Sequence, residues 1–259
     1  MRLIPAFVLV LLGAFSVRAA APLVRLHSHN DYEHVRPLAD AMSHGFWSVE
    51  ADVWLTNGQL LVAHDLANVS RNRTLQSLYL DPLRAFAATN ASLFATAGPI
   101  TLLVDVKSDG TNTWHALRDV FRGYTNLLTR FESNHIHTNA VIVIISGNRA
   151  TQLIANESAR YAAVDGRLPD LDANPPAALV PLVSDNWTKH FKWRGQGPIS
   201  VDEREKLHAL VARSHAQGRR IRLWAAPDSP AGWRELFDAE VDLVNTDRLA
   251  EAEKFLQNR

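Results

Sequence analysis

Residues 46–65 read FWSVEADVWLTNGQLLVAHD and combine a strand, a tight turn and a second strand. The apolar, aromatic-rich run Phe46–Val53 is typical of a buried strand. Asn57-Gly58 is a pair that favours a two-residue hairpin turn. We therefore expect a small hairpin in which Gln59–Val62 pairs with the end of the preceding strand.

The same alternation of a short strand and a helical stretch extends outward from this segment in both directions. The predicted strands are Leu23–His27, Phe46–Val53, Ile100–Val106, Ala140–Ser146, Tyr161–Asp165, Ala178–Ser184, Arg220–Ala225 and Val241–Asn245. The predicted helices are Pro37–His44, Leu75–Phe94, Thr113–Phe131, Arg149–Glu157, Asp202–Gln217, Ala231–Asp238 and Arg248–Leu256. This pattern predicts an α/β fold, a single-domain (β/α)₈ TIM barrel, and about 240 residues is a usual length for that fold. A doubly wound open sheet ranks second, because no glycine-rich phosphate-binding motif follows the first strand.

The amino-terminal residues have the features of a secretory signal. Arg2 is followed by an apolar run and then by small residues that suit a signal peptidase. We expect a signal peptide over residues 1–20, a barrel domain over residues 21–259, and a secreted or periplasmic mature protein. The alternative is a membrane anchor, but the apolar run falls short of the roughly 20 residues that span a bilayer.

Composition excludes several classes of function. The 259 residues include 27 basic and 27 acidic side chains and no cysteine. A neutral net charge gives no support for a nucleic-acid partner, because such proteins carry an excess of positive charge. Without cysteine there is no thiolate nucleophile or cysteine-bound metal, so a metal would need imidazole, carboxylate or amide ligands.

Carboxylates gather where the predicted strands end. Glu50 and Asp52 lie two residues apart and therefore point to the same side of the second strand. Asp105 and Lys107 close the third strand with the same spacing. The carboxyl ends of barrel strands meet at one mouth, where clustered carboxylates require a compensating cation. We therefore predict one divalent cation, Mg²⁺ or Ca²⁺, on Glu50, Asp52 and Asp105, with Lys107 binding an anionic group of the substrate.

Three histidines are expected at the same mouth. His27 and His29 follow the first strand, and His64 follows the hairpin. Imidazole titrates near neutral pH, so one ring can accept a proton from a nucleophilic hydroxyl while another protonates a leaving alkoxide. A cation, a lysine and two imidazoles are the groups that phosphodiester cleavage needs.

The order His, Glu-X-Asp, His-Asp and Asp-X-Lys resembles the glycerophosphodiester phosphodiesterase and phosphatidylinositol-specific phospholipase C superfamily of barrel phosphodiesterases. Residues 28–32, Ser-His-Asn-Asp-Tyr, are similar to the Ser-His-Asn-Thr-Tyr of eukaryotic phosphoinositide phospholipases, which implies a catalytic His29 and a metal-binding Asn30. Alignment by distance from the first strand selects His27 instead. Trp224 and Asn245 resemble strand-end residues of the superfamily, which implies that they bind substrate.

The resemblance implies a metal-dependent phosphodiesterase whose substrate is a glycerophosphodiester or a phospholipid. Two alternatives stay open. The His-X-His pair also occurs in amidohydrolase-like barrel metallohydrolases, and a non-catalytic barrel could bind a phosphate or a lipid headgroup. The loop Asp185–Gly197 mixes Trp187 and Trp193 with cationic side chains. It predicts either a contact with a phospholipid headgroup or a peripheral membrane surface, or an exposed loop with two packing tryptophans.

Overall fold

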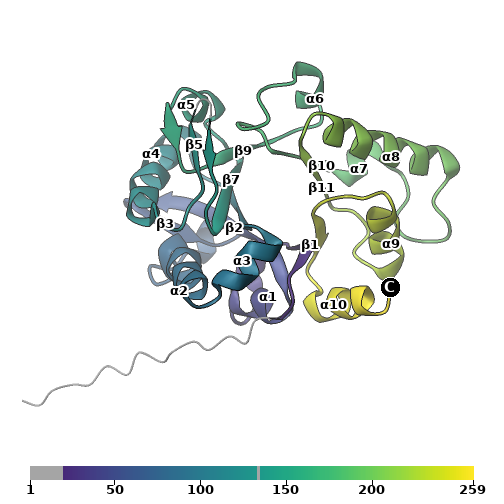
Figure 1. The fold of residues 1–259 in the computed structure, drawn as a ribbon, viewed down its shortest axis with the longest axis horizontal. Helices are drawn as coiled ribbons and strands as arrows, with labels where there is room; N and C mark the ends of the chain where they lie inside the picture. The colour runs from purple at the N-terminus through teal and green to yellow at the C-terminus, as the bar shows by residue number, and fades with distance from the viewer. Residues whose placement is uncertain (1–19, 133–134) are drawn as a thin grey trace, which may run out of the picture.

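A ring of parallel strands forms the centre of the molecule (Figure 1) in the computed structural model, which describes residues 20–132 and 135–259. The strands of the ring, in spatial order, are β12 (Val244–Thr246), β1 (Leu23–Ser28), β2 (Phe46–Thr56), β4 (Ile100–Val106), β7 (Val141–Gly147), β9 (Ala163–Gly166), β10 (Leu182–Asn186) and β11 (Arg220–Trp224). A single parallel bridge between Arg222 and Leu243 brings the two ends of this order together. The result is the nearly closed (β/α)₈ barrel that the sequence predicts, and each predicted strand overlaps an observed one.

The predicted hairpin is also present. Strand β3 (Gln59–Val62) runs antiparallel to the end of β2, with Thr56 opposite Gln59. Asn57 and Gly58 both have positive φ, 50° and 75°. Asparagine and glycine tolerate that conformation better than other residues do, which explains the tight turn.

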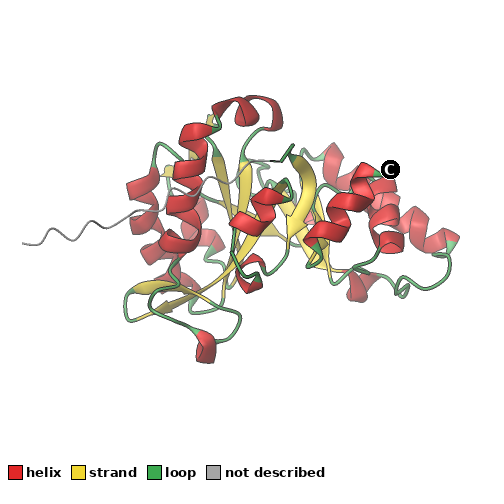
Figure 2. Ribbon diagram, turned by 90° about the horizontal axis from the view of Figure 1, so that it is seen from below, coloured by secondary structure: helices red, strands yellow, loops and turns green. Residues whose placement is uncertain are grey.

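Helices cover the outside of the barrel on both sides, as Figure 2 shows. The α-helices are α1 (Ala39–Ser43), α2 (Asp81–Thr89), α3 (Ala91–Ala97), α4 (Gly110–Phe121), α5 (Thr151–Ala155), α6 (Asp170–Ala173), α7 (Trp187–His190), α8 (Val201–Ala216), α9 (Pro230–Asp238) and α10 (Leu249–Gln257). Short 3₁₀ turns occupy Asp31–Glu33, Leu66–Asn68 and Arg122–Tyr124, and a π-helical turn, Gln76–Leu80, precedes α2.

Two predicted helices were too long. In the stretch predicted as Thr113–Phe131, the α-helix ends at Phe121 and the 3₁₀ turn Arg122–Tyr124 follows it. Phe131 lies in β5 (Arg130–Glu132). That strand pairs with β6 (Ile136–His137) and β8 (Ala159–Arg160) in a small second sheet. Phe131 is buried there, so its apolar character reflects a strand contact and not a helix face.

The helix predicted over Leu75–Phe94 is interrupted at Asn90. Its backbone φ of −127° is not helical, and its side-chain amide donates to the carbonyl of Phe86 at 2.9 Å. Asparagine competes in this way with backbone hydrogen bonds, so α2 ends and α3 begins anew. The strand predicted from Ala178 begins only at Leu182, because residues 179 and 180 hydrogen-bond back to Pro176 in a turn.

The inward-facing residues of the barrel change from apolar to polar toward the carboxyl ends of the strands. Leu103, Ile144, Leu182 and Leu243 form a separate buried cluster inside the ring of strands. The next inward-facing residues toward the carboxyl ends are polar, among them Asp105 and Ser146. The chemistry of the molecule is therefore concentrated at one end of the barrel.

The predicted signal peptide over residues 1–20 lies, apart from Ala20, outside the described residues. Within residues 20–132 and 135–259, no helix has the length and apolar character needed to cross a membrane.

Candidate active site

Three carboxylates meet at the carboxyl ends of β2 and β4. Asp52 lies directly opposite Asp105 in the parallel register of the two strands, and Glu50 precedes Asp52 on the same face. One oxygen of each of these three side chains lies within 4.8 Å of the others. Glu50 and Asp52 are buried, and Asp105 is half-buried. The spacing of two residues places Glu50 beside Asp52, and the parallel register of β2 and β4 brings Asp105 to them.

The chemistry of this cluster fits a divalent cation. The Oδ1 atom of Asp52 is buried and has no hydrogen-bond partner among the described residues. Burial and the neighbouring charge of Glu50 raise the pKa of Asp52 to about 6, and burial also raises the pKa of Asp105. A buried carboxylate oxygen without a partner is costly, and coordination to a hard cation removes that cost. Glu50, Asp52 and Asp105 therefore fit Mg²⁺ or Ca²⁺.

Lys107 lies inside the same cluster. Its Nζ atom is 3.0 Å from Asp52 Oδ2 and 3.4 Å from Asp105 Oδ1. The ammonium group is only partly buried, and the two carboxylates raise its pKa even though burial opposes this. Lys107 is therefore positively charged and lies beside the proposed ligands, where it can also contact an anionic group.

Arg222 is a member of the site that the sequence interpretation missed. Its Nη2 atom donates to Glu50 Oε2 at 2.5 Å, and its Nε atom donates to Asn245 Oδ1 at 2.7 Å. Although burial opposes ionisation, the Arg222 guanidinium holds the pKa of Glu50 well below its usual range. The alternation of Arg220, Arg222 and Trp224 along β11 was the available signal, because residues two apart share one face of a strand.

His27 is fully buried beneath the mouth. Its Nδ1 atom lies 2.7 Å from Ser48 Oγ, and its Nε2 atom lies 3.3 Å from Glu50 Oε2. Burial and the charge of Arg222 lower the pKa of His27 to about 4, so the ring is neutral. Both ring nitrogens are engaged by protein atoms, which suits the orientation of Glu50 better than proton transfer to a substrate.

His29 has a different environment at the rim. Its Nδ1 atom lies 2.8 Å from Asp247 Oδ1, and its side chain is about one-third exposed, at 31%. Burial alone would lower the pKa of His29, but the hydrogen bond to Asp247 and the charge of Glu50 outweigh it and raise the pKa. No described residue hydrogen-bonds to Nε2, so that nitrogen is free to meet a substrate.

Asn30 and Tyr32 connect this rim to the carboxylates. The Tyr32 hydroxyl lies 2.7 Å from Asp52 Oδ2 and 2.9 Å from Asn30 Oδ1. Asn30 has a left-handed backbone with φ of 46°, which turns the chain at this point. The amide oxygen of Asn30 is thus linked through one hydroxyl group to a proposed metal ligand.

Asp31 fixes the same turn from below. This buried carboxylate accepts hydrogen bonds from Ser28 Oγ at 2.8 Å, from the Leu38 amide at 2.6 Å and from the Tyr79 hydroxyl at 2.9 Å. Its contacts are all structural, so Asp31 holds the loop that presents His29 and Asn30.

The remaining predicted residues lie around the mouth with fewer contacts. His64 follows β3, its side chain is 56% exposed, and its Nδ1 atom lies 3.4 Å from Asp65 Oδ1. The Ala63 amide donates to the carbonyl of Asp52 at 3.2 Å, which places His64 beside the middle of β2. Among the described residues, no hydrogen bond or ion pair joins the His64 ring to the carboxylate cluster. Asn245 accepts its hydrogen bond from Arg222, and Trp224 is half-buried at the end of β11.

The two tryptophans after β10 are packing residues. Trp187 is fully buried, stacks on Phe191 with ring centroids 4.0 Å apart, and donates to the carbonyl of Trp193 at 2.9 Å. Trp193 is also buried. Their indole rings are therefore not available at the surface, and contact of this loop with a headgroup would depend on exposed cations such as Lys189.

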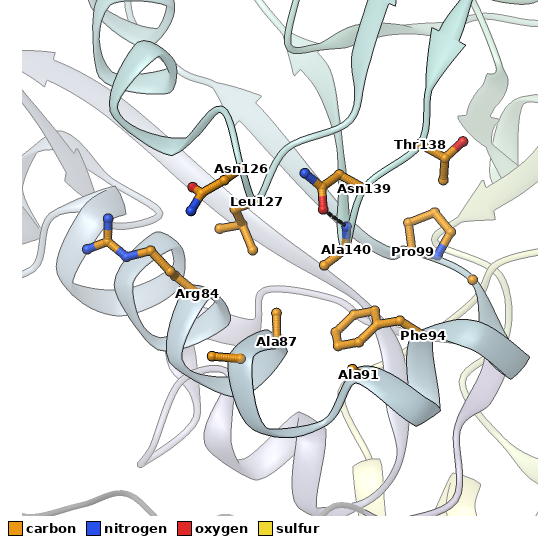
Figure 3. Close-up of a pocket in the computed structure, with 12 residues that line it drawn as sticks. Arg84, Ala87, Ala91, Phe94, Pro99, Asn126, Leu127, Thr138, Asn139 and Ala140 are labelled. Carbon is orange, nitrogen blue, oxygen red and sulfur yellow. Dashed lines mark hydrogen bonds between the residues drawn. The ribbon is translucent and has the colours of Figure 1, made fainter.

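A cavity of about 480 Å³ lies at the other end of the barrel (Figure 3). Pro99 and Ala140, which line it, immediately precede β4 and β7, whereas the carboxylates lie toward the opposite ends of the strands. The lining side chains are mostly small or apolar, and Asn139 is occupied by a hydrogen bond to the Ala140 amide at 2.9 Å. This cavity does not belong to the site described above.

Comparison with known proteins finds relatives that match most of the chain. The chain is 28% identical over 264 residues to "Altered inheritance of mitochondria protein 6 homolog" of Arthroderma benhamiae, a match that covers 86% of this chain and 81% of that protein. It is 30% identical over 278 residues to "Altered inheritance of mitochondria protein 6" of Lachancea thermotolerans, covering 88% of this chain and 64% of that protein.

A solved structure shares the fold. The crystal structure of a glycerophosphodiester phosphodiesterase from Parabacteroides distasonis superposes with a TM-score of 0.55 at 17% identity and covers 91% of this chain and 97% of its own. The model of the AIM6-like phosphodiesterase domain matches residues 16–165, more than half of the chain and the part that carries every proposed metal ligand. The predicted resemblance to barrel phosphodiesterases is thereby confirmed, and the chain belongs to the AIM6-like phosphodiesterase domain family.

Proposed function

We propose that this protein is a divalent-cation-dependent phosphodiesterase that cleaves a glycerophosphodiester or a phospholipid. The observation that carries the proposal is the cluster of Glu50, Asp52 and Asp105, in which a buried oxygen of Asp52 lacks a partner among the described residues. A polarised histidine, His29, stands on the same rim of the barrel. Carboxylates, a lysine and a supported imidazole at one mouth are the side chains that this reaction requires.

Glu50, Asp52 and Asp105 would hold the cation, with Asn30 beside them. A bound divalent cation supplies positive charge to the phosphoryl oxygens and lowers the pKa of a hydroxyl or a water near it. Lys107 adds a second positive charge at the same place, since its ammonium group already lies within 3.4 Å of two of these carboxylates. Trp224 on β11 and Asn245 on β12 would contact the substrate.

His29 is the residue that we propose for proton transfer. Asp247 accepts the hydrogen bond of Nδ1, which leaves Nε2 to exchange a proton with the attacking or the leaving oxygen. His64 is the proposed second acid or base, because its exposed ring follows Ala63, whose amide donates to the carbonyl of Asp52. His27 supports Glu50 from below and takes no part in proton transfer.

The reaction would occur outside the cytoplasm if residues 1–20 act as a secretory signal, as their composition indicates. The proposed partners are small phosphodiesters or phospholipid headgroups. A peripheral contact with a membrane would place the mouth near its substrate, with Lys189 among the exposed cations around it.

The test is hydrolysis by the mature protein of glycerophosphodiesters, phosphatidylinositol, lysophospholipids and a chromogenic phosphodiester, with Mg²⁺, Ca²⁺ or EDTA. We expect turnover with a cation, none with EDTA, and a loss of at least a hundredfold in Glu50→Gln and in Asp52→Asn. Asp119→Asn, an exposed carboxylate on α4, is the matched control and should keep full activity. Turnover in EDTA, or unchanged turnover in both cluster variants, would contradict the proposed function.

A further inference from the structure

Two arginines lie beside the carboxylate cluster without a role in the proposed reaction. Strand β7 is the neighbour of β4, and its Ser146 lies opposite Asp105. Strand β9 is the next strand in the ring. Arg149 follows β7 and Arg167 follows β9, so both occupy the carboxyl-end mouth on the Asp105 side.

Arg167 is held in place by a buried polar cluster. Its Nη1 atom lies 2.8 Å from Oδ2 of Asp165, a carboxylate that is fully buried. Ser146 and Ser184 also donate to Asp165, at 2.7 Å and 2.6 Å. The carboxylate, satisfied on both oxygens, anchors the Arg167 guanidinium. Nη1 also donates to the carbonyl of Gly166 at 2.8 Å and Nη2 to Ser146 Oγ at 3.3 Å, while 30% of the side chain stays exposed.

Arg149 has no such partner. No carboxylate of the described residues lies within 4.0 Å of its guanidinium, and its only hydrogen bond is a long one of 3.5 Å to the carbonyl of Gly147. The side chain is half-buried, and burial together with repulsion from Arg167 lowers its pKa, whereas Asp165 and Asp105 oppose that change. No Arg149 nitrogen is a buried atom without a hydrogen-bond partner, so the free side of the guanidinium is open to solvent and can bind an anion there.

The loop that carries Arg149 is fixed against the strand that carries Asp105 of the carboxylate cluster. The Asn148 amide donates to the carbonyl of Val106 at 2.8 Å, and the Asn148 side chain donates to the carbonyl of Ser108 at 3.1 Å. The backbone of Gly147 packs so closely on Asp105 that a Cβ there would lie 2.1 Å from its Oδ1 atom. Arg149 is therefore held near Asp105 and does not belong to a freely moving surface loop.

We propose that Arg149 and Arg167 form a subsite for a second anionic group on the substrate, a phosphate monoester or a carboxylate carried by its headgroup. This inference rests on the proposed phosphodiesterase function and narrows its substrate class. The planar guanidinium fork matches the oxygens of either anion. Neighbouring strands are about 4.8 Å apart, so the subsite lies roughly 5–10 Å from Asp105, which is the reach of a single headgroup.

The first experiment compares three diesters that share the glycerol side and differ in the headgroup, which ends in a hydroxyl, a carboxylate or a phosphate monoester. We expect kcat/KM to be at least tenfold higher for one of the anionic headgroups. Arg149→Gln should lower that value at least tenfold and change the neutral substrate less than twofold. Arg118→Gln, a half-buried arginine on α4, is the matched control and should change none of the three.

Equal turnover of all three headgroups by the unmodified protein, or equal losses for all three in Arg149→Gln, would overturn the subsite and leave the phosphodiesterase intact. No turnover of any diester would contradict the proposed function instead. The subsite is then decided by binding alone, with ethyl phosphate and propionate titrated into the full-length protein in EDTA. A tenfold or larger weakening of either probe in Arg149→Gln supports the subsite and identifies its anion, and unchanged or absent binding of both overturns it.

Discussion

At the residue scale, two histidines separated by one residue do different work because their surroundings differ. His27 is enclosed by Ser48 and Glu50 and is kept neutral by burial, whereas His29 shares a proton with Asp247 at the rim. Under the proposed function, the same imidazole group orients a buried carboxylate in one position and exchanges a proton with the substrate in the other.

Removing the His29 ring should abolish most of the turnover. We expect His29→Ala to lower kcat by about 10²–10⁴-fold with a small change in KM, since general acid–base catalysis contributes on that order. His115→Ala, on the outer helix α4, provides the control. Steady-state kinetics on the best substrate measures the effect, and a His29→Ala variant with unchanged kcat would exclude the ring from proton transfer.

The charge of Asp247 should set the titration of His29. The hydrogen bond between His29 and Asp247 helps to raise the pKa of His29 in the folded protein above its usual value. Asp247→Asn should therefore lower the pKa of His29. This contact stabilises the fold fully below about pH 6.5, the pKa of a histidine in the unfolded chain. The stabilisation is lost as the pH rises through the higher pKa of His29 in the folded protein. NMR titration of the His29 ring in EDTA measures the shift.

Glu253→Gln, which removes the partner of His44 on the outside of the barrel, should leave the His29 titration in place. If the pKa of His29 is unchanged in Asp247→Asn, the 2.8 Å contact with Asp247 is not the cause of the raised pKa.

At the element scale, the barrel strands present side chains of opposite sign at defined steps around the mouth. Strands β2 and β4 carry the carboxylates, β11 carries Arg222, and the loops after β7 and β9 carry the two further arginines. The parallel register sets these positions, because Asp52 and Asp105 are direct neighbours across two strands. Loops that touch these ends affect the site even where they contribute no ligand.

Gly147 is the clearest example of such a loop position. It has a φ of +66°, and a Cβ there would lie 2.1 Å from Asp105 Oδ1 and 2.4 Å from the carbonyl oxygen of Val106. Gly147→Ala should therefore displace a proposed metal ligand, weaken cation binding at least tenfold and destabilise the fold by about 1–3 kcal/mol. Calorimetric titration with Mg²⁺ or Ca²⁺ and thermal unfolding measure the two effects.

Gly98→Ala separates backbone strain from the steric contact. Gly98 has a similar φ of +72°, but no atom lies within 4 Å of its hypothetical Cβ. We expect the Gly98→Ala variant to be less stable than the unmodified protein and to keep its affinity for the cation. Equal cation affinity in Gly147→Ala and Gly98→Ala would show that the contact with Asp105 does not matter for binding.

At the scale of the whole molecule, the barrel joins segments that are far apart in the chain around one polar mouth. Glu50 and Arg222 are 172 residues apart and share a hydrogen bond, and His29 meets Asp247 across 218 residues. A ligand bound at the mouth therefore contacts groups from both halves of the chain. Its binding free energy should add to the stability of the entire barrel.

A cation should accordingly raise the melting temperature of the protein. At a hundred times its Kd, a ligand that binds only the folded state stabilises it by about 2.7 kcal/mol. We expect this upward shift with Mg²⁺ or Ca²⁺ in the unmodified protein and in Asp119→Asn, and no shift in Asp52→Asn. Differential scanning calorimetry measures it, and an equal shift in all three proteins would place the cation elsewhere.

The sequence by itself determined the alternation of strands and helices, the hairpin and the placement of Glu50 beside Asp52. Apolar runs with β character mark the strands, and the two-residue repeat of a strand places Glu50 beside Asp52 without any knowledge of the rest of the chain. Asn57 and Gly58 determine the hairpin through their own backbone preferences. These features are local, so residues near each other in the chain suffice to predict them.

Only the tertiary structure decided which partners each group meets. The ring of strands brings Arg222 to Glu50, Asp247 to His29 and Arg149 toward Arg167, and none of these pairs has a fixed spacing in the chain. It also buried Trp187 and Trp193 and turned Phe131 into a strand residue, although their apolar character suited other roles equally well. Burial and long-range contact depend on the closed packing of all the elements, which local patterns do not encode.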